Sequence, residues 1–211
     1  MIFDTHAHYD DDAFDEDRDE LLASMAAKNV EYIVNVGASM ASSERSLKLA
    51  EKYPFIYAAV GVHPDEVGEL DEEKFAKLRE WTKYEKVKAV GEIGLDYYWD
   101  KEGHDLQKHW FMRQMELSHE ANLPMIVHSR EAAKDTLKKL IKKYGITLFS
   151  VGNGTASRES EQIIVELFKE IPEKVQYIIT NEAGASVYSA SKLATEEFPN
   201  FDVGQRSAAS I

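Results

Sequence analysis

Residues 87–98 read VKAVGEIGLDYY, an apolar and β-branched run that ends among acidic side chains. An unbroken apolar run is typical of a strand that is buried on both faces of a parallel sheet. Its far end carries Glu92 and Asp96, and an unpaired carboxylate is costly to bury. The stretch therefore predicts a buried strand that delivers carboxylates to one edge of a sheet.

The same pattern repeats along the chain. Seven apolar runs read as strands and cover residues 1–6, 31–37, 56–62, 87–94, 123–129, 146–152 and 175–181. Amphipathic segments follow them at residues 18–29, 43–53, 72–84, 109–122, 132–145, 158–171 and 186–198. Strand then helix, repeated seven times, predicts an α/β fold with a parallel sheet and crossover helices, arranged as a TIM-barrel-like fold. Residues 200–207 offer a weaker eighth strand; without it the alternative is an open α/β sheet, whose unpaired edge favours self-association.

Composition narrows the functional class. The 211 residues include no cysteine, which excludes disulfides, thiolate metal sites and cysteine nucleophiles. With no signal peptide and no membrane-length apolar stretch, the simplest expectation is a cytoplasmic protein. The formal net charge of −13 argues against a broad basic surface for nucleic acid, although divalent metals can supply positive charge locally. Much of the acid lies in residues 10–20 and 65–75, which we expect to be solvated loops and first helical turns.

Side chains able to bind or react gather where the predicted strands end. They are His6, His8, His63, Glu92, Asp96, His128, Arg130, Asn153 and Glu182. In a parallel barrel the carboxyl ends of all strands open on one face, where active sites lie. His6 and His8 are two residues apart on a strand, so they point the same way and can hold one ion. Imidazole suits zinc, and mixed sets of histidine and carboxylate also take manganese or magnesium.

Several of these positions also have plainer interpretations. Asn153 stands between two glycines, which favours a turn over a metal ligand. For Glu182, capping or solvent exposure is favoured over metal binding. Trp110 and Phe111 lie in a helical pattern, and we expect them in the core rather than as a platform for stacking bases.

Four motifs carry a resemblance to a known family. DTHAH (4–8), GVHP (61–64), GEIGLDYY (91–98) and PMIVHSREA (124–132) resemble, in order and spacing, the signatures of TatD-type metal-dependent deoxyribonucleases, which are amidohydrolase-like TIM barrels. The resemblance covers roughly residues 1–140. It implies a divalent metal (Zn, Mn or Mg) and a DNA or phosphodiester substrate. It further implies metal ligands at His6, His8, Glu92 and His128, with Glu92 bridging two ions, and catalytic or substrate-side roles for Glu92, His63, Asp96 and Arg130.

The later part of the chain resembles a different family. Residues 145–211, with the runs GNGTASRE (152–159) and NEAGASVYSAS (181–191), are similar to part of the RNase H-like (YqgF-type) domain of the Tex transcription accessory proteins. A TatD-type barrel is expected to place another histidine and an aspartate on its later strands. This chain has no histidine after His128.

Together the two resemblances predict one α/β domain over residues 1–211 that is an engineered chimera. Five βα units of TatD type (1–140) would join two of Tex type (145–211), with a seam near residues 137–145. We expect a fold-recombination scaffold that retains half of a divalent-metal site, with weak or no hydrolase activity. Two alternatives stay open: an active TatD-type DNase or phosphodiesterase, and a nucleic-acid-binding module.

Overall fold

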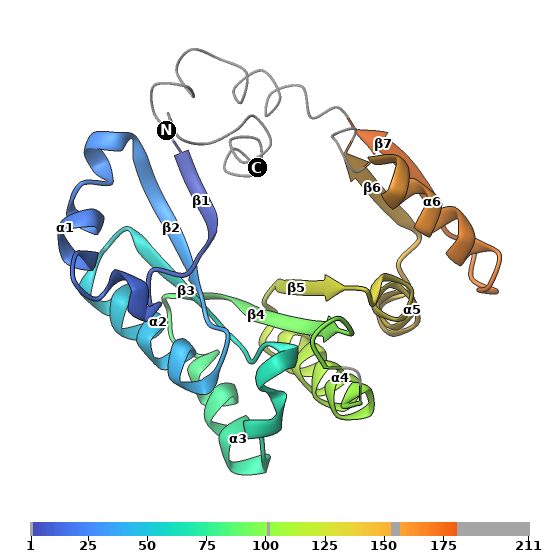
Figure 1. Cartoon of the computed structure of the whole chain (residues 1–211), viewed down its shortest axis with the longest axis horizontal. Helices are drawn as coiled ribbons and strands as arrows, with labels where there is room; N and C mark the ends of the chain where they lie inside the picture. The colour runs from blue at the N-terminus through green and yellow to red at the C-terminus, as the bar shows by residue number, and fades with distance from the viewer. Residues whose placement is uncertain (1, 101, 153–156, 181–211) are drawn as a thin grey trace. The chain divides into compact units, whose positions relative to one another are not determined.

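The computed structural model describes residues 2–100, 102–152 and 157–180. The chain divides into two compact units, Met1–Ala132 and Ala133–Ile211, here called the N-terminal and C-terminal units. Strands form at all seven places where the sequence predicts them (Figure 1).

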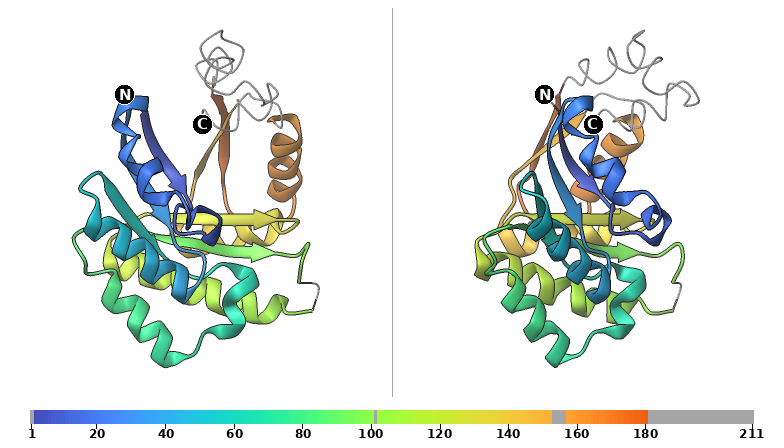
Figure 2. Two further views of the ribbon diagram at one scale, coloured as in Figure 1. Left: turned by 60° about the vertical axis from the view of Figure 1, so that its left-hand side comes forward. Right: turned by 90° about the vertical axis from the view of Figure 1, so that its left-hand side faces the viewer.

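The N-terminal unit is built on a parallel sheet of five strands in the order β1-β2-β3-β4-β5. The sheet curls like part of a barrel wall (Figure 1 and Figure 2). This confirms the predicted parallel α/β fold. The strands are β1 (Ile2–Ala7), β2 (Val30–Val36), β3 (Ile56–Val60), β4 (Val87–Asp96) and β5 (Met125–Arg130).

Helices connect these strands, and α2, α3 and α4 lie on one face of the sheet (Figure 2). Ser39 and Asp71 cap the first turns of α2 and α3 by accepting backbone N–H groups, as short polar side chains do at helix starts. Trp110 and Phe111 of α4 are buried, as predicted. The helical segments are α1 (Arg18–Ala23), α2 (Met40–Lys52), α3 (Glu72–Trp81), α4 (His104–Ala121), and the short 3-10 helices η1 (Asp12–Phe14), η2 (Ala26–Lys28) and η3 (Pro64–Glu69).

Burial differs between the central and edge strands of this sheet. Ile33, Val60 and Val90, from β2, β3 and β4, are fully buried. Ile2 and Phe3 of β1 are instead 43% and 55% exposed. The expectation that every strand is buried on both faces is therefore wrong for β1, because in the described residues β1 is an edge strand that pairs with β2 alone. Self-association through an open sheet edge stays a prediction.

Asp10 corrects the expectation that residues 10–20 are solvated. Its carboxylate is buried and accepts hydrogen bonds from the Asn35 amide at 2.8 Å and from the Ser42 hydroxyl at 2.6 Å. The Asn35 oxygen in turn accepts the backbone N–H of Tyr9 at 2.6 Å. A buried carboxylate needs such partners. Asp10 therefore anchors the loop after β1.

The C-terminal unit is a smaller βα assembly. Its strands β6 (Leu148–Gly152) and β7 (Gln176–Thr180) form a parallel two-stranded sheet, and its helices are α5 (Ala133–Tyr144) and α6 (Ser157–Phe168). Ile141, Val151, Ile164 and Leu167 form the buried interior. The predicted apolar stripe of α6 thus faces inward at Ile164 and Leu167.

The described strands therefore divide into sheets of five and two, where the sequence suggested one sheet of seven or eight. The predicted helix at 186–198 and the weak strand at 200–207 lie outside the described residues. The single domain with a seam near 137–145 stays a prediction. Within the described part of the chain, no helix combines the length and apolarity that crossing a membrane requires.

Candidate metal centre

Four histidines and two carboxylates meet at the carboxyl end of the N-terminal sheet. Parallel strands deliver them there, because all their carboxyl ends face one way. β1 carries His6 and ends just before His8, and His63 follows β3. The remaining members are Glu92 and Asp96 on β4 and His128 on β5.

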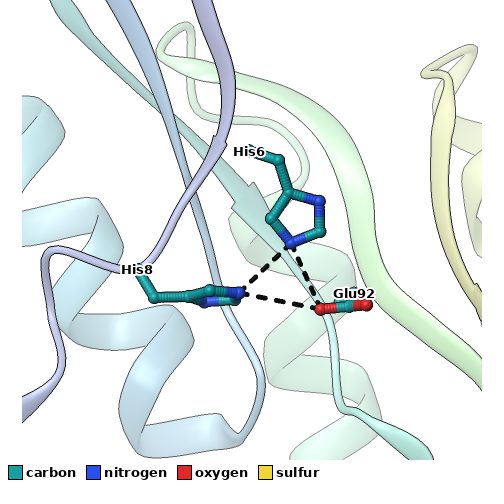
Figure 3. A group of neighbouring side chains, drawn as sticks. All are labelled: His6, His8 and Glu92. Carbon is teal, nitrogen blue, oxygen red and sulfur yellow. Dashed lines mark hydrogen bonds and ion pairs between the residues drawn. The ribbon is translucent and has the colours of Figure 1, made fainter. Parts of the chain in front are cut away.

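The first group joins His6, His8 and Glu92 (Figure 3). The Oε2 atom of Glu92 lies 3.3 Å from His6 Nε2 and 3.7 Å from His8 Nε2. The two histidine Nε2 atoms are 3.1 Å apart. His8 Nδ1 lies 2.8 Å from the carbonyl oxygen of Val36, which orients the ring so that Nε2 points at the other two side chains.

The second group joins His63, Glu92 and His128, whose candidate ligand atoms all lie within 4.8 Å of one another. His128 Nδ1 lies 3.2 Å from Glu92 Oε1, the carboxylate oxygen not used by the first group. The His63 and His128 rings meet edge to face at 4.2 Å. The structure thus brings His63 among the candidate ligands, whereas the family resemblance put it on the substrate side.

Asp96 stands behind His128. Its Oδ2 atom lies 2.9 Å from His128 Nε2, and the side chain is buried. A carboxylate that holds the second nitrogen of a ligating histidine fixes the ring's orientation and basicity. Asp96 therefore belongs to the site by orienting a histidine, and it is in neither group of candidate ligands.

Arg130 lies beside the site without joining either group. Its guanidinium carbon is 4.0 Å from the centre of the Tyr98 ring and 5.3 Å from that of Trp99. Sequence reasoning named Arg130 but missed these two aromatic residues. In the sequence they stand two and three residues after Asp96, at and just after the end of the GEIGLDYY motif. Asn153 and Glu182, the weaker sequence candidates, lie outside the described residues.

Two glycines explain how β5 comes so close to β4. A Cβ atom at Gly94 would collide with the carbonyl oxygen of His128, and Gly94 has a φ of 152°. A Cβ atom at Gly91 would approach the Ile126 Cβ to 2.6 Å. The GEIG motif is thus what allows His128 to lie beside Glu92.

The charges at the centre are coupled. Burial opposes ionisation of Glu92, yet hydrogen bonds with His128 and His6 outweigh it and hold the pKa of Glu92 well below its usual range. The same bonds to Glu92 raise the pKa of His6 and of His128 against the effect of burial. Burial and the neighbouring His128 lower the pKa of His63.

The residues present fit a divalent metal. Imidazole nitrogens mixed with carboxylate oxygens are a donor set that zinc, manganese and iron accept. Glu92 offers one oxygen to each group, as a carboxylate shared between two cation positions would. The assignment of individual ligands stays a prediction.

Comparisons with known proteins show similarity to one family over most of the chain. A family model described as TatD related DNase matches residues 3–195. The uncharacterized metal-dependent hydrolase YabD of Bacillus subtilis is 43% identical over 145 residues, which are 69% of this chain and 56% of that protein. The 3'-5' ssDNA/RNA exonuclease TatD of Cronobacter sakazakii is 33% identical over 131 residues, 62% of this chain and 50% of that protein.

A different relative covers less of the chain. The transcriptional accessory protein Tex of Neisseria gonorrhoeae is 49% identical over 86 residues, 40% of this chain and 11% of that protein.

Among solved structures, that of YJJV, a TatD homolog from Escherichia coli, superposes with a TM-score of 0.67 at 27% identity and covers 92% of this chain and 76% of that one. The chain spans about half the length of the curated hydrolase relatives that it matches.

Proposed function

Because the chain belongs to the TatD-related DNase family, we propose that its N-terminal unit holds divalent metal and hydrolyses phosphodiester bonds in single-stranded nucleic acid. The observation that carries this proposal is the position of Glu92, whose two oxygens face two different sets of histidines. The similarity to a metal-dependent hydrolase and to a single-strand exonuclease supports the choice of reaction and substrate.

The reaction joins a water oxygen to phosphorus and breaks the bond from phosphorus to the leaving ester oxygen, which takes up a proton. Divalent metal bound here would supply positive charge beside the phosphoryl oxygens and make water more acidic. His6, His8, Glu92 and His128 would hold the metal, and Asp96 keeps the His128 ring turned toward it. His63, whose pKa is lowered by burial and by the neighbouring His128, would line the substrate side of the site.

We further propose that the chain is an engineered chimera with weak activity. A TatD-type fragment (1–140) would join a Tex-type fragment (145–211) near residues 137–145. YabD matches 69% of the chain and Tex matches 40% of it, and these two proteins are not similar to each other in name or described role. Matches to two different kinds of protein support a composite origin. So does the division between compact units after Ala132. The family model nevertheless extends to residue 195, so the later residues also fit the TatD pattern in part.

Weak turnover is expected because the resemblance implies further metal ligands on the later strands, and the sequence has no histidine after His128. Loss of groups around a metal usually lowers affinity and activity together. As a fold-recombination scaffold, the protein should unfold at temperatures that a chelator leaves unchanged. A large loss of stability on chelation would count against the scaffold proposal.

The test of the hydrolase proposal is cleavage of a labelled single-stranded oligonucleotide with added Mn²⁺ or Mg²⁺. The double variant His6→Ala/His8→Ala should lose the metal-dependent rate, and chelator should abolish it in the unsubstituted protein. YabD of Bacillus subtilis assayed in parallel should be faster. Equal rates for the double variant and the unsubstituted protein would contradict the proposal, since the activity would then come from a contaminant or another site.

A nucleic-acid-binding module is the less favoured alternative. The similarity to Tex supports it, but the net charge of −13 opposes nonspecific attraction to phosphates. Binding that strengthens steeply as salt is lowered, and that persists in the His6→Ala/His8→Ala variant with chelator, would favour this alternative.

A further inference from the structure

Two large aromatic side chains lie exposed on the loop that follows β4. Trp99 is 65% exposed and Tyr98 is 41% exposed. Their rings are 4.7 Å apart and nearly perpendicular, at 87°. We call this pair the aromatic ledge. Exposed apolar side chains that lie together mark a candidate site for contact with a ligand or partner.

A single carboxylate ties the aromatic ledge to the candidate metal centre. Asp96 Oδ1 accepts the backbone N–H groups of Tyr98 at 2.8 Å and of Trp99 at 3.1 Å. Asp96 Oδ2 contacts His128 Nε2 at 2.9 Å. The ledge is therefore held in place beside the histidine that Glu92 also contacts.

The loop beneath the ledge is braced from the helix that follows it. Gln107 of α4 is buried, accepts the backbone N–H of Asp96 at 3.0 Å and donates to its carbonyl oxygen at 2.9 Å. The backbone N–H of Tyr97 bonds to the Arg130 carbonyl oxygen at 3.0 Å. The two residues directly before the ledge are thus fixed by hydrogen bonds.

A cation accompanies the rings. The guanidinium of Arg130 lies over Tyr98, with 4.0 Å between its carbon and the ring centre, and 5.3 Å from the centre of the Trp99 ring. Aromatic faces combined with arginine are the means by which proteins hold single-stranded nucleic acid without reading its sequence. In a duplex the base faces are already stacked, so a ledge of this kind favours unpaired strands.

We propose that the aromatic ledge stacks a nucleobase of a single strand next to the phosphodiester at the metal centre, with Arg130 supplying positive charge to the adjoining backbone. The proposal rests on the proposed function, because it places the base relative to the bond that is cut. Trp99, the more exposed ring, carries most of the stacking area. Stacking depends on a base face and not on its hydrogen-bonding edge, so the ledge does not select among sequences.

The test compares binding of two labelled strands of equal length, oligo(dT) and an abasic oligonucleotide with the same number of phosphates. Binding is measured on the full chain in chelator, so that no strand is cut. The unsubstituted protein should bind oligo(dT) more tightly than the abasic strand. Trp99→Ala should weaken binding of oligo(dT) by about tenfold and leave the abasic strand unchanged. Trp99→Phe, which keeps a ring, should restore most of the difference.

The matched control is Tyr84→Ala. Tyr84 is also exposed, at 47%, but it precedes the first residue of β4, at the opposite end of that strand from the ledge. This variant should bind both strands as the unsubstituted protein does. A second readout uses fluorescence: Trp81 and Trp110 are buried, so quenching by oligo(dT) should come from Trp99 and disappear in Trp99→Phe.

Equal affinity of the unsubstituted protein for the two strands would overturn the ledge proposal. So would a Trp99→Ala variant that loses affinity for both strands alike, since that loss is not stacking. Neither result touches the hydrolase proposal, which depends on metal-dependent cleavage and on its loss in His6→Ala/His8→Ala. Base-dependent binding without any cleavage would instead remove the hydrolase proposal and leave the stacking assignment standing.

Discussion

At the scale of single residues, Glu92 decides what the site can do. Its side chain is 14% exposed, yet it stays charged because histidines contact both of its oxygens. His6 and His128 gain proton affinity from the same contacts, so metal bound here would have to displace protons from these two imidazoles. The ion pairs with Glu92 therefore oppose metal binding, and neighbours that hold the histidine rings influence how well metal competes.

Asp96→Asn tests the role of one such neighbour. The amide keeps an oxygen that can accept the backbone N–H groups of Tyr98 and Trp99, but it removes the negative charge that faces His128. We expect metal affinity, measured by calorimetric titration with Mn²⁺ or Zn²⁺, to fall about 10- to 100-fold. Asp71→Asn is the control, since asparagine caps a helix about as well as aspartate. Unchanged affinity in Asp96→Asn would mean that Asp96 serves the loop alone.

The sequence located the site residues better than their partnerships. Strand ends and spacing picked out His6, His8, Glu92 and His128, and the structure brings all four together. The sequence could not show that Asp96 is buried behind His128, because an aspartate at the end of a strand can equally well be exposed. The orientation of a side chain depends on what packs against it, and those neighbours come from distant parts of the chain.

At the scale of elements, the loop after β1 is held by buried hydrogen bonds instead of apolar packing. Asp10 receives bonds from Asn35 on β2 and Ser42 on α2, so the loop after β1, the strand β2 and the helix α2 meet at one carboxylate. Ser46 accepts a further bond from the Asn35 amide at 2.8 Å. This network fixes the chain just after His8 and so supports the first group of ligands.

Asp10→Ala should therefore destabilise the N-terminal unit strongly. Removing the carboxylate leaves the Asn35 amide and the Ser42 hydroxyl without their acceptor in a buried setting, which costs about 2–4 kcal/mol of unfolding free energy. Denaturation by urea, followed by tryptophan fluorescence, measures the change. The control is Asp12→Ala, an exposed residue in the same acidic run, where the change should stay within about 0.5 kcal/mol. Similar losses in the two variants would rule out the buried network as the cause.

Elements were predictable where the apolar pattern was strong. All seven runs became strands, because a continuous β-branched run has few other stable uses. The pattern could not say what covers each strand, and Phe3 of β1 is exposed although its sequence resembles that of the buried strands. An apolar run reports what a strand can bury. The partner that buries it is a property of the whole fold.

At the scale of the whole molecule, the chain divides into two compact units, and its described strands form one sheet of five and one of two. The sequence predicted a TIM-barrel-like fold, with an open α/β sheet as the alternative, because strand and helix alternate along the chain and no local pattern marks which strands pair. Which strands pair is decided by contacts between residues far apart in the chain. Local patterns do not record those contacts.

Two unfolding transitions are the expected consequence. Trp81, Trp99 and Trp110 all lie in the N-terminal unit, so tryptophan fluorescence follows that unit alone, whereas circular dichroism follows both. Leu167→Ala, in the interior of the C-terminal unit, should shift a transition that only circular dichroism detects. Leu78→Ala, equally buried in α3, should shift the fluorescence transition, and each substitution should cost about 2–5 kcal/mol.

Leu167→Ala and Leu78→Ala together distinguish separate unfolding of the two units from unfolding as one body. If Leu167→Ala moves the fluorescence transition as far as Leu78→Ala does, the two units unfold as one cooperative body. A single transition that coincides for both measurements in every variant would lead to the same conclusion. The two-unit description would then hold for the geometry of the chain but not for its energetics.

The bonds that aim His8 and His128 have a consequence for how such a fold can be modified. His8 is turned by the carbonyl of the adjoining strand, and His128 by a carboxylate on its own neighbour in the sheet. Each imidazole is thus aimed by the structural module next to it. Exchange of distant strands and helices can therefore change how many metal ligands the site has without changing the orientation of His8 and His128. The orientation of these two candidate ligands thus depends on neighbouring strands of one sheet and not on distant parts of the chain.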